Sequence, residues 1–245
     1  MSEDRKLTGK VAMVFGGSRG IGAAAARRLA REGANVGLTY VSAPDKAADT
    51  VRAIEEEGRT GFAIKADSAD PTAIRDAVTQ VVDQLGRLDI VVVNAGILRL
   101  GDLQAVSLQE LDIMLKVNVR GVFFAIQAAA HLSDGGRIIT VGSNTAVRSG
   151  YPGSSVYAMT KAAVAVMVKG IAVDLAPRGI TVNNIQPGPT LTDMTASHID
   201  SITPAIPIKR VGHPDEIAGL VDYLASGESG YMTGSSLTID GGMAL

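Results

Sequence analysis

The sequence has no cysteine and no tryptophan, and aromatic residues make up only 4% of its 245 residues. Without cysteine the chain forms no disulfide bond and offers no thiolate ligand to a structural zinc ion. A chain of this length buries roughly 70–75% of its unfolded surface, so it folds without such cross-links. The 28 glycines predict small-residue elements joined by tight turns rather than a sandwich with an aromatic core.

An excess of charge of one sign is also missing. The 23 lysines and arginines nearly balance the 25 aspartates and glutamates, and the formal net charge is -2. Proteins that bind nucleic acids usually carry a basic excess or a basic stripe. Arg27, Arg28 and Arg31 do cluster, but their helical spacing among alanine and leucine is typical of a solvated helix face. We therefore expect no nucleic-acid partner.

Long apolar runs are lacking as well. No run of about 18 apolar residues occurs, and the N-terminus holds no apolar segment of the kind that directs secretion. We expect a cytoplasmic protein with no membrane partner. His131, His198 and His213 lack the spacing of metal ligands, so no metal site is expected. A serine hydrolase is disfavoured because no Gly-x-Ser-x-Gly turn occurs.

Apolar runs alternate with segments of helical periodicity along the whole chain. The runs are short, continuous and rich in valine and isoleucine, as strands covered on both faces of a parallel sheet must be. The alternation predicts an α/β fold, a doubly wound parallel sheet of the Rossmann kind with about seven strands, in a single domain spanning residues 1–245. The predicted strands are 11–15, 35–40, 61–66, 88–94, 137–143, 179–185 and 236–239, and the predicted helices are 21–31, 45–57, 71–85, 108–130, 156–176 and 213–224.

Two of these helical segments are apolar almost all the way round. One sheet face covers only part of a helix, so residues 111–130 and 156–176 need a second partner. A chain of this size has little material for a third layer. We therefore expect copies of the chain to associate through the helices at 108–130 and 156–176.

A glycine cluster at residues 16–22 separates the first predicted strand from the first predicted helix. Glycine lets the backbone turn sharply and approach a pyrophosphate, whose charge is stabilised by free N–H groups at the helix start. A purely structural turn would also use glycine, but this position favours dinucleotide binding. No Gly-Lys-Ser/Thr follows, which disfavours a nucleoside-triphosphate loop.

The end of the second predicted strand bears on which dinucleotide binds. An NAD site usually places an acidic residue about 20 residues after the glycine loop. Here Tyr40 holds that position, Ser42 follows, and the nearest acid, Asp45, is better explained as a first-turn residue of a helix. With no carboxylate to repel a 2'-phosphate and Arg19 able to pair with it, the sequence favours NADP(H) over NAD(H).

Tyr157 and Lys161 stand four residues apart and so share one face of a helix. An amphipathic tyrosine beside a surface lysine is common, but a neighbouring cation also favours the phenolate and would lower the tyrosine pKa from about 10 toward neutrality. Ser143 ends the preceding strand at the edge where open α/β sheets bind ligands. The Gly/Ser/Pro-rich segment 144–155 can curl back, so the serine hydroxyl could orient a substrate carbonyl.

Together these motifs resemble the short-chain dehydrogenase/reductase family of the compact type, and the resemblance covers essentially the whole chain. Phe15 and Val93 depart from the family pattern, and we expect a hydrophobic contact between neighbouring strands to replace a hydrogen bond there. The motifs that carry the resemblance are the glycine loop 16–22, the segment 93–96, the segment 116–121 with Asn118, the set Ser143, Tyr157 and Lys161, the segment 187–192, and the segments 210–218, 233–234 and 240–242.

The resemblance implies an NADP(H)-dependent oxidoreductase that interconverts a ketone or aldehyde and an alcohol by hydride transfer, of the carbonyl or 3-oxoacyl reductase type. Tyr157 would be the acid/base, and Lys161 would hold the nicotinamide ribose and lower the Tyr157 pKa. Ser143 would fix the substrate oxygen. Asn118 would support a water that relays protons, or would merely bond backbone within its helix. Family members of this length are commonly homotetramers.

The resemblance also assigns cofactor contacts. Asn94 would contact the adenosine ribose side, Asp67 the adenine, and Thr192 with the Thr190 backbone the carboxamide. Alternatively, Asp67 would cap a turn and Thr192 would start a short helix. The residues expected to bind the cofactor are Gly16, Ser18, Arg19, Gly20, Ile21, Gly22, Tyr40, Ser42, Asp67, Asn94, Ala95, Gly96, Tyr157, Lys161, Pro187, Gly188, Thr190 and Thr192.

The segment at about 190–210, here named the lid, is expected to cover the substrate. Its isoleucines, Met194 and prolines make it apolar, and it lacks the basic cluster that a phosphorylated carrier substrate would prefer. A mostly apolar or mixed ketone is therefore expected. The competing interpretation is a non-catalytic dinucleotide-binding sensor on the same fold, because fold alone does not separate the two.

Overall fold

The computed structural model describes residues 5–129 and 132–245. His131, Ala130 at the end of one predicted helix, and the first four residues lie outside the described part. Within these two ranges, no group of three His, Cys, Asp or Glu side chains is placed to hold a metal ion.

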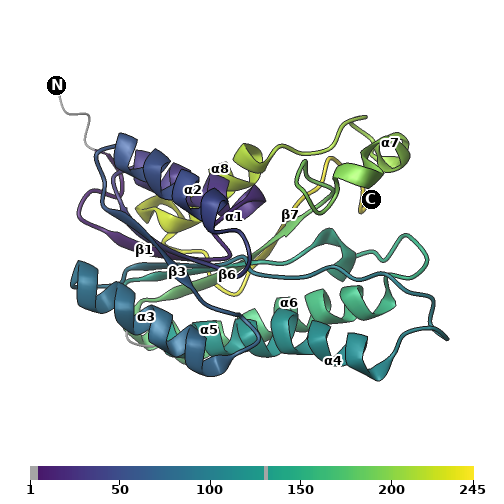
Figure 1. Cartoon of the computed structure of the whole chain (residues 1–245), viewed down its shortest axis with the longest axis horizontal. Helices are drawn as coiled ribbons and strands as arrows, with labels where there is room; N and C mark the ends of the chain where they lie inside the picture. Colours follow the sequence, from purple (N-terminus) through teal and green to yellow (C-terminus); the bar gives the residue numbers. More distant parts are fainter. Residues whose placement is uncertain (1–4, 130–131) are drawn as a thin grey trace.

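Seven parallel strands form one sheet in the order β3-β2-β1-β4-β5-β6-β7 (Figure 1). The chain crosses over after β3 and continues outward on the other side of β1, so the sheet is doubly wound, as predicted. β1 and β4 are buried along their whole length, which explains their continuous apolar sequences. The strands are β1 Val11–Phe15, β2 Asn35–Tyr40, β3 Gly61–Lys65, β4 Ile90–Val93, β5 Arg137–Val141, β6 Thr181–Pro187 and β7 Ser236–Ile239.

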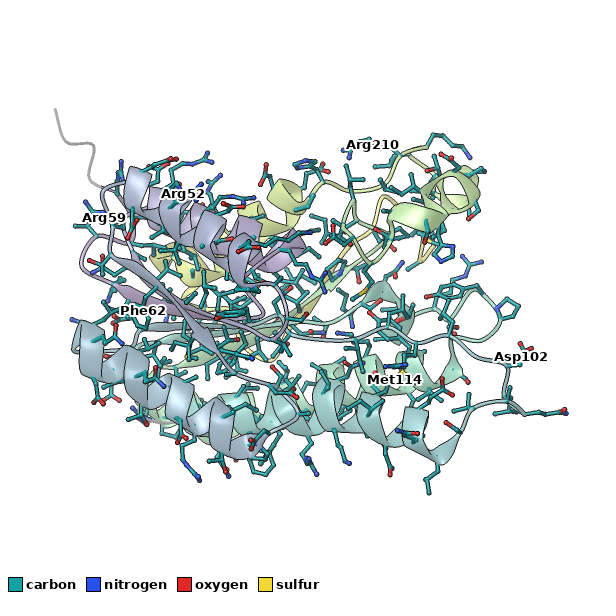
Figure 2. All side chains as sticks on the ribbon, viewed as in Figure 1. Arg52, Arg59, Phe62, Asp102, Met114 and Arg210 are labelled. Carbon is teal, nitrogen blue, oxygen red and sulfur yellow. The ribbon has the colours of Figure 1, made fainter. Side chains whose placement is uncertain are left out.

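Helices cover both faces of the sheet (Figure 1). On one face lie α1 Gly20–Arg31, α2 Pro44–Glu56 and α8 Pro214–Ala225. On the other lie α3 Pro71–Leu85, α4 Leu108–Leu115, α5 Val122–Ala128 and α6 Ser155–Leu175. Apolar side chains fill the space between the sheet and each helical layer. The buried Met114, a residue of α4, is one of these side chains (Figure 2).

The helix predicted at 108–130 is interrupted. After α4 the backbone widens into a π-helix, η1 Lys116–Gly121, before α5 begins. Two contacts account for this local geometry. The Asn118 side chain exchanges hydrogen bonds with the Ile97 backbone, and a Cβ on Gly121 would come within 2.2 Å of the Ser68 carbonyl oxygen. Such π-bulges occur frequently at functional sites.

Strand ends also differ slightly from the prediction. β4 begins at Ile90, two residues after the predicted start, and the buried carboxylate of the preceding Asp89 accepts a hydrogen bond from the Val11 amide at 3.0 Å. β5 ends at Val141, two residues before the predicted end, so Ser143 stands just beyond the strand. Phe15 and Val93 are paired across β1 and β4 and share one apolar cluster, as the expected hydrophobic contact requires.

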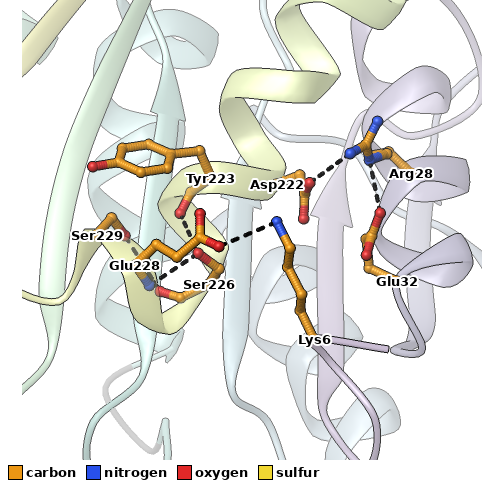
Figure 3. A network of polar contacts seen from close by, with 8 residues as sticks. All are labelled: Lys6, Arg28, Glu32, Asp222, Tyr223, Ser226, Glu228 and Ser229. Atoms are coloured by element: carbon orange, nitrogen blue, oxygen red, sulfur yellow. Dashed lines mark hydrogen bonds and ion pairs between the residues drawn. The ribbon is translucent and has the colours of Figure 1, made fainter. Parts of the chain in front are cut away.

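Polar contacts join α1 to α8 at the amino end of the sheet. Arg28 donates to Asp222 at 2.7 Å and also pairs with Glu32 at 3.2 Å (Figure 3). Arg27 and Arg31 are exposed, as predicted, but Arg28 is half-buried in this contact between helices. Sequence spacing does not reveal it, because Asp222 is 194 residues away.

Of the described helices, one is long and apolar enough to cross a membrane by length and composition. It is the span Ser155–Arg178, which contains α6. Its inward residues Val164 and Val168 are fully buried against the sheet, and 33% of its apolar window is buried. A core helix passes the same test, so a single such helix is only a weak indication of a membrane span.

Candidate active site

Three of the four predicted catalytic side chains converge where β5 ends and α6 begins. Ser143 lies two residues past β5 and hydrogen-bonds with Tyr157, which lies in the first turn of α6. One turn further along α6, Lys161 is buried with its ammonium 5.6 Å from the centre of the Tyr157 ring. Lys161 Nζ donates to the Val141 carbonyl oxygen at 3.0 Å. The three residues therefore form one polar cluster at the carboxyl edge of the sheet, in which Ser143 and Lys161 are buried and Tyr157 is partly exposed.

Asn118 adjoins this group from η1 and is fully buried. Its side chain accepts from the Ile97 amide at 2.9 Å and donates to the Ile97 carbonyl at 2.9 Å. It also donates to Thr160 of α6 at 3.2 Å. Its amide thus bonds backbone outside its own helix, and it ties the segment after β4 to α6 beside Lys161.

Burial controls the protonation of the two catalytic candidates. It raises the pKa of Tyr157 to about 12, although the hydrogen bond with Ser143 acts in the opposite direction and Tyr151 adds to the rise. Burial also lowers the pKa of Lys161 to about 8. The Tyr157 pKa is therefore raised in this structure rather than lowered toward neutrality, and the effect of Lys161 on it stays a prediction. Removal of the phenolate from water is the largest cause of the rise. The Lys161 ammonium is bonded to the Val141 carbonyl oxygen.

The glycine cluster brings β1, α1 and β4 into close contact. Gly16 has φ +73°, and a Cβ there would lie 2.9 Å from Ala95 Cα. A Cβ on Gly22 would lie 2.1 Å from the Gly16 carbonyl oxygen, which accepts a hydrogen bond from Asn94 at 2.8 Å. Asn94 therefore holds the glycine loop in place. Gly96, from the same segment, lies where a Cβ would approach Lys161 Nζ to 3.4 Å.

The start of α1 suits an anion such as a dinucleotide pyrophosphate. The helix begins at Gly20, no described side chain caps it, and its first turn holds no acidic residue. Its first N–H groups are therefore available to a ligand, and the helix dipole favours negative charge there. An open groove of about 490 Å³ lies at this point, lined among others by Ser18, Arg19, Gly20 and Thr192.

The remaining predicted cofactor residues lie at the carboxyl ends of neighbouring strands. Tyr40 ends β2 and Pro187 ends β6. The Asp67 carboxylate accepts a hydrogen bond from the Ala69 amide at 2.8 Å. It therefore caps a turn, which is the alternative given above to a contact with adenine. The Thr192 amide donates to the Thr195 hydroxyl oxygen at 3.2 Å, and the Thr190 hydroxyl donates to the Gly188 carbonyl oxygen at 3.0 Å. Ile21 is the second residue of α1, and Ser42 lies in the bend between β2 and α2.

The lid holds short helical turns, including α7 Ile199–Ile202, which stands apart from α1, α2 and α8 (Figure 1). Its far end is anchored by Arg210, which forms two 2.7 Å hydrogen bonds with Glu216. Arg210 and the His213 amide hold the pKa of Glu216 low, at about 2. In the lid, Ile206 is buried, whereas Met194 and Ile208 are about half exposed, so an apolar surface is available to a ligand.

Two functional candidates were not found by sequence reasoning. Lys46 in the first turn of α2 pairs with Asp193 of the lid at 2.6 Å, and Arg19 reaches the same carboxylate at 3.3 Å. Lys46 and Asp193 are 147 residues apart, and neither belongs to a recognisable motif. Only the fold brings them into the groove.

Comparison with known proteins agrees with this geometry. A family model described as "Enoyl-(Acyl carrier protein) reductase" matches residues 16–244. The chain is 42% identical over 239 residues to the "Cyclic-di-GMP-binding biofilm dispersal mediator protein" of Escherichia coli, covering 96% of this chain and 97% of that protein. It is 38% identical over 259 residues to "Versicolorin reductase 1" of Aspergillus parasiticus, covering 99% of each chain.

A solved structure gives the same result in three dimensions. The crystal structure of a short chain dehydrogenase from Burkholderia cenocepacia J2315 in complex with NADP superposes with a TM-score of 0.95 at 48% identity, covering 98% of this chain and 100% of the other. The motifs, the strand order and the full-length likeness lead to one conclusion. This chain belongs to the short-chain dehydrogenase/reductase family.

Proposed function

We propose that this protein is an NADP(H)-dependent oxidoreductase that interconverts a ketone or aldehyde and the corresponding alcohol, of the carbonyl or 3-oxoacyl reductase type. The observation that carries the proposal is the cluster of Tyr157 with the buried Ser143 and Lys161 at the carboxyl edge of the sheet, beside the glycine loop. A protein that only binds a nucleotide has no need of a phenol, a serine hydroxyl and an ammonium in one cluster.

Each residue of the cluster has a definite task in reduction. The nicotinamide cofactor supplies the hydride when bound. Ser143 Oγ orients the substrate oxygen, and Tyr157 Oη donates its proton to that oxygen as the carbonyl carbon gains the hydride. A phenol with a pKa of about 12 is fully protonated at neutral pH, so it is ready to act as the acid. The Lys161 ammonium then stabilises the phenolate that remains.

Asn118 acts on this chemistry through position. It fastens Ile97 and Thr160 to each other, and Thr160 precedes Lys161 in α6. The backbone that carries Lys161 is thereby fixed against the end of β4. Such support matters because catalytic geometry must be held within fractions of an ångström.

The preference for NADP(H) rests on charge at the end of β2. Tyr40 and Ser42 provide no carboxylate to repel a 2'-phosphate, and Arg19 lines the groove at the start of α1. The relative from Burkholderia cenocepacia was crystallised with NADP. The test is direct titration of the protein with NADPH and NADH. Weaker binding of NADPH than of NADH would contradict the preference.

The substrate is a mostly apolar or mixed ketone. The exposed Met194 and Ile208 and the apolar composition of the lid support this class, and the lid at about 190–210 would close over it. The experiment is to follow NADPH consumption with a panel of ketones, aldehydes and 3-oxoacyl thioester models. We expect turnover of apolar members of the panel. NADPH binding without turnover of any carbonyl compound would contradict the enzymatic proposal.

A second candidate function is a dinucleotide-binding sensor without catalysis. The observation in its favour is the 42% identity to an Escherichia coli protein that is named for binding cyclic-di-GMP. Calorimetric titration with cyclic-di-GMP, beside the ketone panel, separates the two candidates. Binding of the cyclic dinucleotide together with absence of carbonyl turnover would favour the sensor.

The chain would act as a single domain assembled into a homotetramer. The outward sides of α5 and α6 carry exposed apolar residues, namely Phe123, Val166 and Val173, which further copies of the same helices would cover. Light scattering would test this. A Val166→Glu, Val173→Glu double variant should reduce the molar mass from about four times 25.3 kDa toward a smaller assembly. An unchanged mass would contradict this interface, and a monomeric wild type would contradict the assembly.

A further inference from the structure

Three charged side chains from distant segments meet in the groove at the start of α1. Arg19 immediately precedes that helix, Lys46 lies in the first turn of α2, and Asp193 belongs to the lid. Both cations contact the same carboxylate oxygen, Asp193 Oδ2, Lys46 at 2.6 Å and Arg19 at 3.3 Å. All three side chains are about half exposed, so an incoming ligand has access to them.

The fold explains why Lys46 faces the glycine loop. Only three residues separate the end of β2 from α2, so α2 starts beside the carboxyl edge of the sheet. One turn after Lys46, the Thr50 hydroxyl contacts the Ser18 carbonyl of the glycine loop at 3.5 Å. Residues four apart share a helix face, so Lys46 lies on the side of α2 that faces the loop.

The groove has an overall positive character. Arg19, Arg27 and Lys46 line it together with Asp49 and Asp193. Asp49 already pairs with Arg52 at 3.2 Å. The pKa of Asp193 is lowered, first by the hydrogen bond from Lys46 and then by Arg19. Asp193 is therefore an anion held by two cations next to the N-terminus of a helix.

From this arrangement we propose that Lys46 and Arg19 together bind the 2'-phosphate of NADP(H), and that Asp193 competes with that phosphate for the same two cations. Attachment of the lid to α2 and binding of the 2'-phosphate then exclude each other. The inference rests on the proposed function and adds to it a second specificity-determining cation, Lys46, and a competing residue, Asp193.

The competition follows from charge and from the number of acceptor atoms. A phosphate monoester carries about -1.5 to -2 charges at neutral pH and three acceptor oxygens, whereas the Asp193 carboxylate carries one charge. The two cations therefore bind the phosphate more strongly than the carboxylate. Because Asp193 must be displaced first, it reduces the net affinity for the phosphate. Because all three protein groups are exposed to solvent and salt, the effects are of moderate size. NADH has no 2'-phosphate, so it should not sense either residue.

The experiment measures dissociation constants for NADPH and NADH by fluorescence titration of the full-length protein at fixed ionic strength, with 2',5'-ADP and 5'-AMP as fragment probes. For Lys46→Gln we expect NADPH and 2',5'-ADP to bind about three- to tenfold more weakly. For Asp193→Asn we expect both to bind about two- to fivefold more tightly. In both variants NADH and 5'-AMP should bind as they do to the wild type.

Two matched variants control for the change of charge alone. Lys6→Gln removes a lysine from an exposed pair with Glu228, at 3.5 Å (Figure 3). Asp134→Asn removes an aspartate from an exposed pair with Arg178, at 2.9 Å. Neither residue lines the groove, so both variants should keep the wild-type ratio of NADPH to NADH affinity.

The outcomes separate this inference from the proposed function. Equal weakening of NADPH and NADH by Lys46→Gln would assign Lys46 no role toward the 2'-phosphate and overturn the first half of the proposal. An unchanged NADPH affinity in Asp193→Asn would overturn the competition. If the wild type binds NADPH tightly but neither variant differs from it, the proposed function stands and only this inference fails. If the wild type binds neither cofactor, both fail.

Discussion

Buried charged groups have different kinds of partner at the two edges of the sheet. At the amino edge, the buried carboxylates of Asp89 and Asp222 are each paired with arginine, Asp89 with Arg87 at 2.6 Å and Asp222 with Arg28 at 2.7 Å. At the carboxyl edge, the buried ammonium of Lys161 is bonded to a neutral carbonyl oxygen instead. Its charge is therefore not cancelled by a bonded carboxylate, and burial lowers its pKa to about 8.

The difference separates groups that hold the fold together from groups available for chemistry. A buried carboxylate paired with arginine resists separation of the elements that carry the two groups, because breaking the pair would leave a buried charge without a partner. An ammonium kept near its titration point, next to a phenol, responds to proton movement at that phenol. Perturbed groups of this kind cluster at functional sites, and in this fold the carboxyl edge is also where ligands bind.

The largest expected effect comes from the phenol. Tyr157→Phe removes the proton donor and should lower kcat for carbonyl reduction by about 10²–10⁴-fold, measured as NADPH consumption. NADPH affinity should change little, since the ring remains. Tyr231→Phe, at a fully exposed tyrosine, is the control and should retain wild-type kcat. If Tyr157→Phe retained its activity, Tyr157 would not be the proton donor in the reaction.

The second expected effect is a pH dependence set by Lys161. Because burial lowers its pKa to about 8, the ammonium is present below that pH and is lost above it. The reduction rate should therefore fall as pH rises through about 8, by up to about tenfold per unit. Tyr157, with a pKa of about 12, does not titrate in this window.

A conservative variant tests whether Lys161 causes the expected fall of the reduction rate above pH 8. In Lys161→Arg the cation does not lose its proton at these pH values, so the activity that remains should stay constant past pH 8. Lys169→Arg, at an exposed position of the same helix, should leave the wild-type profile unchanged. A wild-type profile that stays flat to pH 10 would contradict the role of the ammonium.

The smallest effect is expected at the amino edge. Asp222→Asn removes the charge that holds Arg28 and should lower the free energy of unfolding by about 1–2 kcal/mol, because Arg28 is partly exposed to solvent. The folded variant should keep wild-type kcat. Asp134→Asn, which breaks an exposed pair, should change stability by less than about 0.5 kcal/mol in the same denaturant titration. A loss of kcat in folded Asp222→Asn would contradict the assignment of the amino-edge pairs to stability alone.

Most of the fold was predictable because its signals are local. The limits of β1, β2, α3 and β7 match the prediction, because apolar runs and helical periodicity are patterns of residues close together in the sequence. The interruption of 108–130 was not predictable, because Asn118 leaves regular helix geometry for a contact with Ile97, 21 residues away. Of the site, Ser143, Tyr157 and Lys161 were found through spacing and strand position. Lys46 and Asp193 were missed because no pattern links them.

The sequence by itself determined the alternating elements, the glycine loop and the helical spacing of Tyr157 and Lys161, because each depends on residues that are neighbours along the chain. Tertiary structure alone decided how those groups ionise. The pKa of Tyr157 rises rather than falls because the packed site removes its phenol from water. The same holds for the meeting of Lys46, Arg19 and Asp193, which depends on where two loops lie at the edge of the sheet.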